Sequence, residues 1–117
     1  MITGINLDET VEYSISTDKE NPTIFILGII PATVIMGLSF NVEVSKNVET
    51  MVQVIQLGLK GWKNFDKEFE TEKKVIAGRE VQTVKRDLVD TFSAQVIVEL
   101  ATKILEVNKL SEQERKN

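Results

Sequence analysis

The sequence predicts an α+β fold: a small domain with β-hairpins and two main helices, the C-terminal helix packed on the sheet. Residues 11–16 and 23–27 have the apolar patterns of strands, whereas residues 45–59 and 94–108 repeat apolar side chains at helical spacing. The chain has 117 residues, of which 42% are hydrophobic, which is enough for one core and too little for two. We therefore expect residues 1–117 to form a single domain.

The N-terminal strands are predicted to pair as a hairpin. Residues 11–16 alternate apolar and polar side chains, the pattern of a half-buried strand. Residues 17–22 (TDKENP) form a polar turn, and the continuous apolar run over 23–27 is typical of a strand covered on both faces. Two structures are possible after this run. Either Pro31 begins a short helix that extends to Met36, or the stretch continues as a strand.

The central helix is predicted over residues 45–59. One stripe is apolar, the opposite side is polar, and Val54 and Leu57 lie off the stripe, which predicts a second covered surface. The stripe consists of Val48, Met51, Val52, Ile55 and Leu59, and the polar side of Glu49, Gln53, Gln56 and Lys60.

The stretch GLKGWKNFDKEF, residues 58–69, holds the only tryptophan. Gly61 is placed to end the central helix in the left-handed conformation, while Trp62 continues the helix stripe and closes the core with Phe65. A base-stacking or sugar-binding platform needs several exposed aromatic side chains beside basic ones, and aromatic residues are only 6% of this chain. The structural interpretation of this stretch is therefore favoured.

Residues 66–84 fit two structures. Phe65, Phe69 and Ile76 have helical spacing, and Glu70 and Lys74 could pair across one turn. Short strand-like runs on both sides of Ala77-Gly78 instead indicate a hairpin, which we favour.

The last helix is predicted over residues 94–108. Ser93 is placed as its N-cap, and Glu99 and Lys103 are spaced for an ion pair. Residues 111–114 (SEQE) match a capping box that precedes a short terminal turn. More than half of the helix circumference is apolar, which is wider than a two-layer domain usually needs. We therefore expect a homo-oligomer, or a symmetric partner, that uses this helix or the strand edges. The expected interface residues are Val96, Val98 and Leu105.

Composition argues against catalysis. The chain has no cysteine and no histidine, which excludes thiolate nucleophiles and removes the commonest general base and metal ligand. We expect no enzyme activity, cofactor, metal or small-molecule substrate.

Charge and hydropathy bear on partners and location. A net charge of −4 argues against nucleic acid and membranes as partners, although an acidic patch could face a basic protein. The longest apolar run, residues 24–40, is broken by Gly28, Pro31 and Gly37, and no signal peptide is seen, so we expect an intracellular, soluble protein.

Two groups of acidic residues are candidate sites. Asp87 and Asp90, one helical turn apart, could act as a general acid and base only in a cleft that shifts their pKa values. Thr91 and Ser93 lack an activating base. The alternating acids could gather a hard cation on one strand face, but a solvated surface is the favoured interpretation; they are Asp66, Glu68, Glu70 and Glu72.

Three stretches resemble small proteins of tailed bacteriophages: NPTIFILGIIP, GLKGWKNF and VIVELATKILEVNKLSEQERKN. The resemblance implies a minor capsid, connector or tail-assembly component that binds other phage structural proteins, in the host cytoplasm during assembly or in the virion. The alternative is a small inhibitor or adaptor that binds a host protein. A hydrolase that uses only Asp87 and Asp90 is the least favoured hypothesis.

Overall fold

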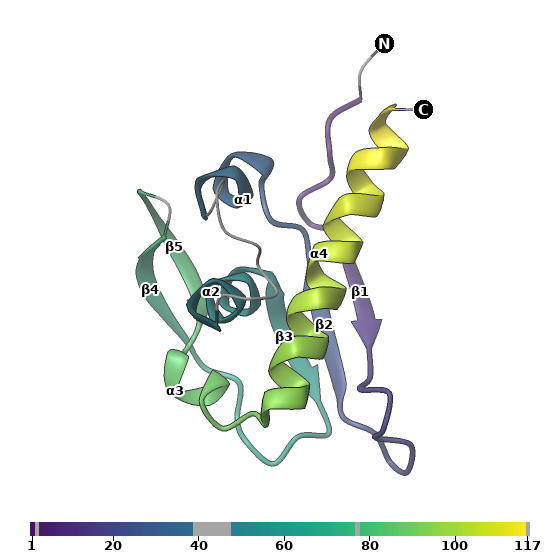
Figure 1. Ribbon diagram of the computed structural model, residues 1–117, viewed down its shortest axis with the longest axis vertical. Helices are drawn as coiled ribbons and strands as arrows, with labels where there is room; N and C mark the ends of the chain where they lie inside the picture. The colour runs from purple at the N-terminus through teal and green to yellow at the C-terminus, as the bar shows by residue number, and fades with distance from the viewer. Residues whose placement is uncertain (2, 39–47, 77, 117) are drawn as a thin grey trace.

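The computed structural model describes residues 1, 3–38, 48–76 and 78–116, and it confirms the α+β fold (Figure 1). Its elements are, in chain order, β1 (Thr10–Tyr13), β2 (Ile24–Gly28), α1 (Ala32–Leu38), α2 (Val48–Gly58), β3 (Leu59–Lys63), β4 (Thr71–Ile76), β5 (Arg79–Val84), α3 (Arg86–Val89) and α4 (Ala94–Lys116). The 11-residue α2 and the 23-residue α4 are the two main helices.

The N-terminal hairpin is confirmed. β1 and β2 pair antiparallel, with Thr10 opposite Gly28 and Tyr13 opposite Phe25. β1 ends at Tyr13 rather than at the predicted Ser16, because the backbone N–H and hydroxyl of Ser16 donate to Glu99 on α4 instead of to a strand.

The sequence predicted that both faces of β2 are covered, and this is wrong. Only the face that points into the core is fully covered. Phe25 and Leu27 are buried in the core, whereas Ile24 and Ile26 are half-buried on the other face. Glu12 and Lys63 form an ion pair of 2.9 Å, and these residues stand opposite Ile26 and Ile24 in the register. This exposed ion pair therefore lies on the outer face of the sheet.

Strand β3 was not predicted from the sequence. It follows α2 directly and pairs antiparallel with β2 in a sheet of order β1-β2-β3, with Gly61 opposite Ile26. Gly61 is therefore a strand residue without positive φ, and Trp62 does not continue the helix, which ends at Gly58. The apolar residues around this junction fit either period, so periodicity alone did not show where the helix stops.

The second hairpin is confirmed, and the helical alternative for residues 66–84 is wrong. β4 and β5 pair antiparallel from Thr71 opposite Val84 to Ile76 opposite Arg79. Gly78 has φ +76°, a conformation that glycine adopts without steric cost. Ala77, the other predicted tip residue, lies outside the described residues. Glu70 does not pair with Lys74; its carboxylate lies 3.6 Å from Lys85.

Of the two structures predicted after Pro31 the helix is confirmed, whereas the end of α4 differs from expectation. The stretch after Pro31 is helical, and the Pro31 carbonyl accepts the N–H groups of Val34 and Ile35. Helix α4 runs without a break to Lys116, so residues 111–114 continue a helix rather than begin a new turn. Residues 94–116 contain no glycine or proline, so no helix-breaking residue ends the helix at Asn108.

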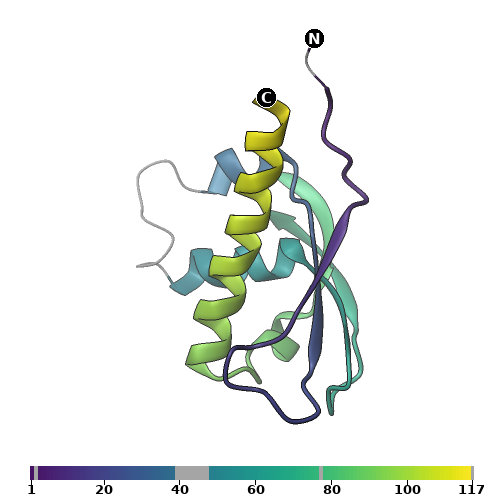
Figure 2. The same cartoon turned by 90° about the vertical axis from the view of Figure 1, so that its right-hand side faces the viewer.

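Helices α2 and α4 lie on the same side of the sheet, and α4 packs on it (Figure 2). The two helices meet at Gly58, where a side-chain carbon would collide with Ile104. The centre of the core lies at this close approach, where Ile104 belongs to one buried cluster with Leu27, Ile55 and Leu100.

Helix α2 is covered on more sides than predicted. Val54 and Leu57 are buried, which confirms the second covered surface. Gln56, placed on the polar side by the sequence, is also buried: its amide donates to the Val84 carbonyl and its oxygen accepts from Lys74. The β4–β5 hairpin covers this side of α2, an arrangement that a helical wheel cannot show.

Candidate interaction surface

Helix α4 buries one face and leaves the opposite face in solvent. The buried positions, Leu100, Ala101, Ile104 and Val107, recur at helical spacing and face α2 and the sheet. Ser93 caps the helix as predicted, with its hydroxyl accepting the Val96 N–H at 3.3 Å.

The three residues expected at an interface lie on two different edges of α4. Val96 is half-buried beside Ile15 and Phe92, on the edge that faces the turn after β1. Val98 is 48% exposed, and the half-buried Leu105 lies two helical turns further along the same side. Val98 and Leu105 can therefore belong to one contact surface, but Val96 belongs to another.

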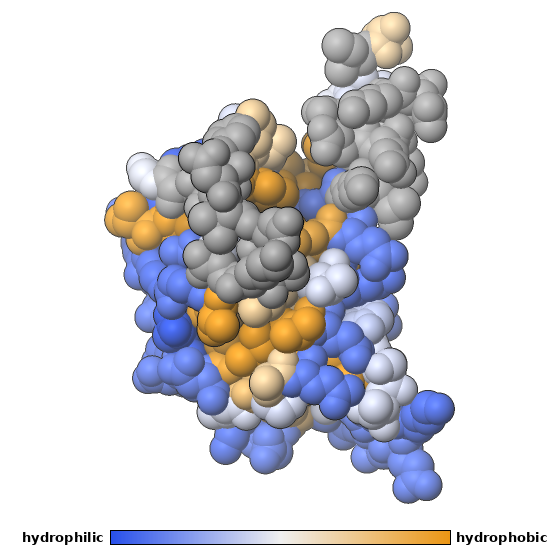
Figure 3. Space-filling model, viewed as in Figure 1, coloured by the Kyte–Doolittle hydropathy of each residue, from blue (hydrophilic) through white to orange (hydrophobic). Residues whose placement is uncertain are grey.

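Apolar side chains gather over α2 and α4 on the face shown in Figure 3. Val48 at the start of α2 is 64% exposed, although the sequence placed it on the buried stripe. On α4, Ile97 is half-buried against the core next to the exposed Val98, which also borders the hollow lined by Tyr13, Glu99 and Lys103. We call the set Val48, Ile97, Val98 and Leu105 the α2–α4 surface. Val48 and Ile97 were not predicted at an interface, because helical periodicity marks apolar positions without showing which of them the fold covers.

The other edge of α4 is fixed to the N-terminal hairpin by Glu99. Its carboxylate accepts hydrogen bonds from the Tyr13 hydroxyl at 2.7 Å and from the Ser16 N–H at 2.8 Å and hydroxyl at 2.7 Å. The Ser16 N–H, followed by the Tyr13 hydroxyl, lowers the pKa of Glu99. Burial, and next the bond to Glu99, raises the pKa of Tyr13 to about 12. Lys103 does not pair with Glu99 as predicted; its ammonium lies 5.5 Å from the Tyr13 ring centroid.

The aromatic side chains near residue 62 form a packed cluster, as the structural interpretation predicted. Trp62 meets Phe65 and Phe69 edge to face, with ring centroids 4.9 and 4.8 Å apart. Its indole N–H donates to the Lys67 carbonyl at 2.8 Å. Because this N–H already has a partner and the rings pack on one another, Trp62 is a structural residue.

Asp87 and Asp90 do not share a buried site in this structure. Both are exposed; Asp87 lies in the first turn of α3 and Asp90 at its end. Arg86 binds Asp90 at 3.3 Å and Glu49 at 3.0 Å, which links α3 to the start of α2. This arrangement is a surface ion-pair network between two helices.

The alternating acids do not share a strand face. Asp66, Glu68 and Glu70 precede β4 and are exposed, and only Glu72 lies in the strand, where it accepts the Arg86 N–H at 2.9 Å. Among the described residues, no group of acidic side chains is arranged to hold a metal ion.

No family model matches this chain, and comparisons with curated proteins and with solved structures find no similar protein. None of the helices in the described residues is both long and apolar enough to cross a membrane.

Proposed function

We propose that this protein is a non-enzymatic structural or assembly component of a tailed bacteriophage, and that it works by packing its α2–α4 surface against a neighbouring copy. The observation that carries the proposal is the exposure of Val48 and Val98 on two adjacent helices, beside the half-buried Ile97 and Leu105. The phage assignment itself rests on the three sequence stretches that resemble phage proteins.

The energetics favour covering this surface. Full burial of a valine or leucine side chain contributes about 1.5–3 kcal/mol, so even partial burial of Val48 and Val98 in each of two copies supplies a useful driving force. A symmetric contact uses the same patch on both partners, which doubles the effect of each apolar residue. Virion components are used in repeated copies, and such a contact suits that role.

Sedimentation velocity over a wide concentration range tests the proposed contact. We expect concentration-dependent association, and we expect Val98→Lys to weaken it at least tenfold. Val75→Lys is the matched control: Val75 is also exposed, at 68%, but lies on β4, and the substitution changes the net charge equally. Mass spectrometry of purified phage particles, with wild-type and substituted chains, tests the assembly role.

Three outcomes would overturn the proposal. The first is a monomer at all concentrations that is also absent from particles and from assembly intermediates. The second is a Val98→Lys variant that associates and assembles as well as the wild type. The third is a monomer that captures a single host protein and is dispensable for particle formation, which would support the inhibitor or adaptor hypothesis instead.

A further inference from the structure

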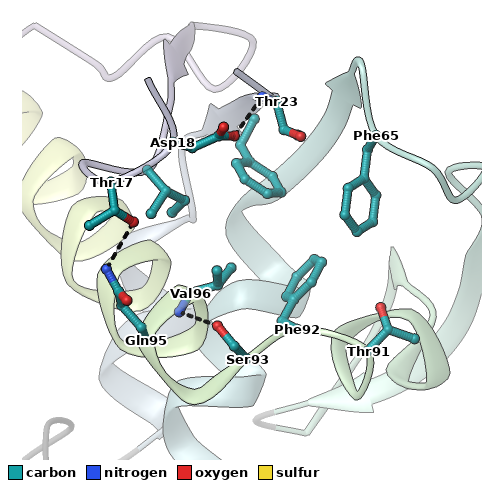
Figure 4. Close-up of a pocket in the computed structure, with 11 residues that line it drawn as sticks. Thr17, Asp18, Thr23, Phe65, Thr91, Phe92, Ser93, Gln95 and Val96 are labelled. Carbon is teal, nitrogen blue, oxygen red and sulfur yellow. Dashed lines mark hydrogen bonds between the residues drawn. The ribbon is translucent and has the colours of Figure 1, made fainter. Parts of the chain in front are cut away.

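A cavity of about 290 Å³ opens between the turn after β1, the loop after β3 and the start of α4 (Figure 4). Its inner wall is apolar and mainly aromatic, formed by Ile15, Phe25, Phe65, Phe92 and Val96. A single water needs only about 10–15 Å³, so the cavity has room for a whole side chain of another molecule.

The polar rim of this cavity offers several hydrogen-bond acceptors. The hydroxyl of Thr23 donates to the Asn64 carbonyl at 2.8 Å, and that of Thr91 donates to the Leu88 carbonyl at 2.6 Å. The amide nitrogen of Gln95 donates to Thr17 at 3.3 Å. Since the Thr23 and Thr91 hydroxyl protons are used within the chain, these two oxygens keep lone pairs for a ligand that donates. The Gln95 carbonyl also accepts, and the Thr17 and Ser93 hydroxyls can accept as well as donate.

Asp18 is the one charged side chain among the described residues that line the cavity. One carboxylate oxygen accepts the Thr23 N–H at 2.8 Å, which fixes the side chain at the rim (Figure 4). No hydrogen bond from the described residues reaches its other oxygen. A half-buried carboxylate with a free oxygen favours a cationic donor.

We propose that this cavity binds the arginine side chain of a basic partner protein. A guanidinium group has five N–H donors for the acceptors at the rim and a planar face that stacks on phenyl rings such as Phe65 and Phe92. The arginine stem suits the apolar wall, and Asp18 supplies the opposite charge. The net charge of −4 on the whole chain favours approach of a basic segment.

The start of α4 at this rim is the feature that would favour an anion instead. A helix N-terminus carries about half a positive charge on its free N–H groups. Here the Ser93 hydroxyl already accepts the Val96 N–H, and the full negative charge of Asp18 lies at the same opening. The balance of charge therefore favours a cation.

The probe for the test is N-acetyl-arginine amide, titrated into the full-length ¹⁵N-labelled protein at low salt and followed by NMR. We expect the amide signals of residues at this rim to shift. We expect N-acetyl-citrulline amide, which has nearly the same shape without the charge, to bind at least about tenfold more weakly.

Asp18→Asn tests the carboxylate, because an amide keeps an oxygen for the Thr23 N–H and so preserves the turn. We expect it to weaken binding of the arginine probe about tenfold, with unchanged thermal stability. Asp8→Asn is the control, since it makes the same change in net charge at an exposed residue that does not line the cavity.

Equal binding of the arginine and citrulline probes would overturn the proposal, as would equal effects of Asp18→Asn and Asp8→Asn. Tighter binding of N-acetyl-glutamate amide would identify an anion site, and tighter binding of N-acetyl-phenylalanine amide would identify an apolar one; both contradict an arginine site. The cavity shares no residue with the α2–α4 surface, so its failure would leave the proposed assembly contact standing.

Discussion

The carboxylate of Glu99 on α4 and the hydroxyl of Tyr13 on β1 form a hydrogen bond of 2.7 Å across 86 positions of the chain. Ser16 adds two further donors to the same carboxylate. β1 is an edge strand whose first residues are exposed, so few apolar contacts hold it. Glu99 is therefore the principal polar connection between the first strand and the last helix.

Replacing Glu99 should loosen the N-terminal hairpin. We expect Glu99→Gln to lower the free energy of unfolding by about 1–2 kcal/mol, since charged hydrogen bonds at a partly exposed site become neutral ones. Tyr13→Phe should cost about 1 kcal/mol, and the double variant should cost less than the sum because both changes weaken or remove the same hydrogen bond. Urea unfolding at neutral pH measures all three; Glu106→Gln, an exposed position on the same helix, should be nearly neutral.

The lowered pKa of Glu99 predicts a contribution to stability that depends on acid pH. Since the folded pKa lies below the unfolded value of 4.5, this contribution is present above pH 4.5 and is lost as the pH falls through the folded pKa. The free energy of unfolding should therefore fall more steeply below pH 4.5 in the wild type than in Glu99→Gln. Parallel curves for the two proteins would contradict the prediction.

The single tyrosine predicts a second change at alkaline pH. The pKa of Tyr13 is raised from 10.0 to about 12. The contribution of Tyr13 to the free energy of unfolding is therefore complete below pH 10 and is lost as the pH rises through 12. The absorbance of tyrosinate measures this pKa without assignment, because Tyr13 is the only tyrosine. Glu99→Gln should shift the absorbance midpoint towards 10.0, since it removes a neighbouring charge that opposes ionisation. An unmoved midpoint would contradict a contribution of Glu99 to the raised pKa of Tyr13.

Gly58 is predicted to be the least substitutable residue of α2. An added side-chain carbon would collide with Ile104, which has no exposed surface, so we expect Gly58→Ala to cost about 1–3 kcal/mol by overpacking. Gly61→Ala is the control, because its nearest neighbour, the Ile26 side chain, lies 3.5 Å from the added atom. Chemical denaturation measures the effect of Gly58→Ala on the free energy of unfolding, in the wild-type background and in Ile104→Ala. We expect Gly58→Ala to cost less in the Ile104→Ala background, because the shorter side chain leaves room for the added carbon.

Asn108 is predicted to hold the end of β2 to α4. Its side-chain oxygen accepts the Ile30 N–H at 2.8 Å and its amide donates to the Ile104 carbonyl at 2.7 Å, both in buried surroundings. Asn108→Leu should therefore cost about 1–3 kcal/mol, since the Ile30 N–H is left buried without a partner. Hydrogen exchange should show selective loss of protection at Ile30. A cost below about 0.5 kcal/mol would mean that another group or water replaces the amide.

Local patterns in the sequence determined the class of this fold and most of its elements. The alternation over residues 11–16, the apolar run over 23–27 and the glycine at the second hairpin tip each act through near neighbours. The helical spacing over residues 94–108 predicted that α4 packs on the core, because burial of an amphipathic helix needs no knowledge of which element covers it. The lack of cysteine and histidine likewise limits the chemistry open to this chain, because it is a property of composition and does not depend on folding.

Tertiary structure decided what depends on distant partners. β3 forms because β2 offers it an edge, although its residues also fit a helical stripe. Gln56 is buried because the second hairpin covers it, and Glu99 binds Tyr13 rather than Lys103 because β1 lies beside α4. Val48 and Val98 stay exposed because nothing in the described chain covers that side of the two helices. A one-dimensional pattern marks which side chains prefer to be buried, but only the packed structure shows which of them found a partner.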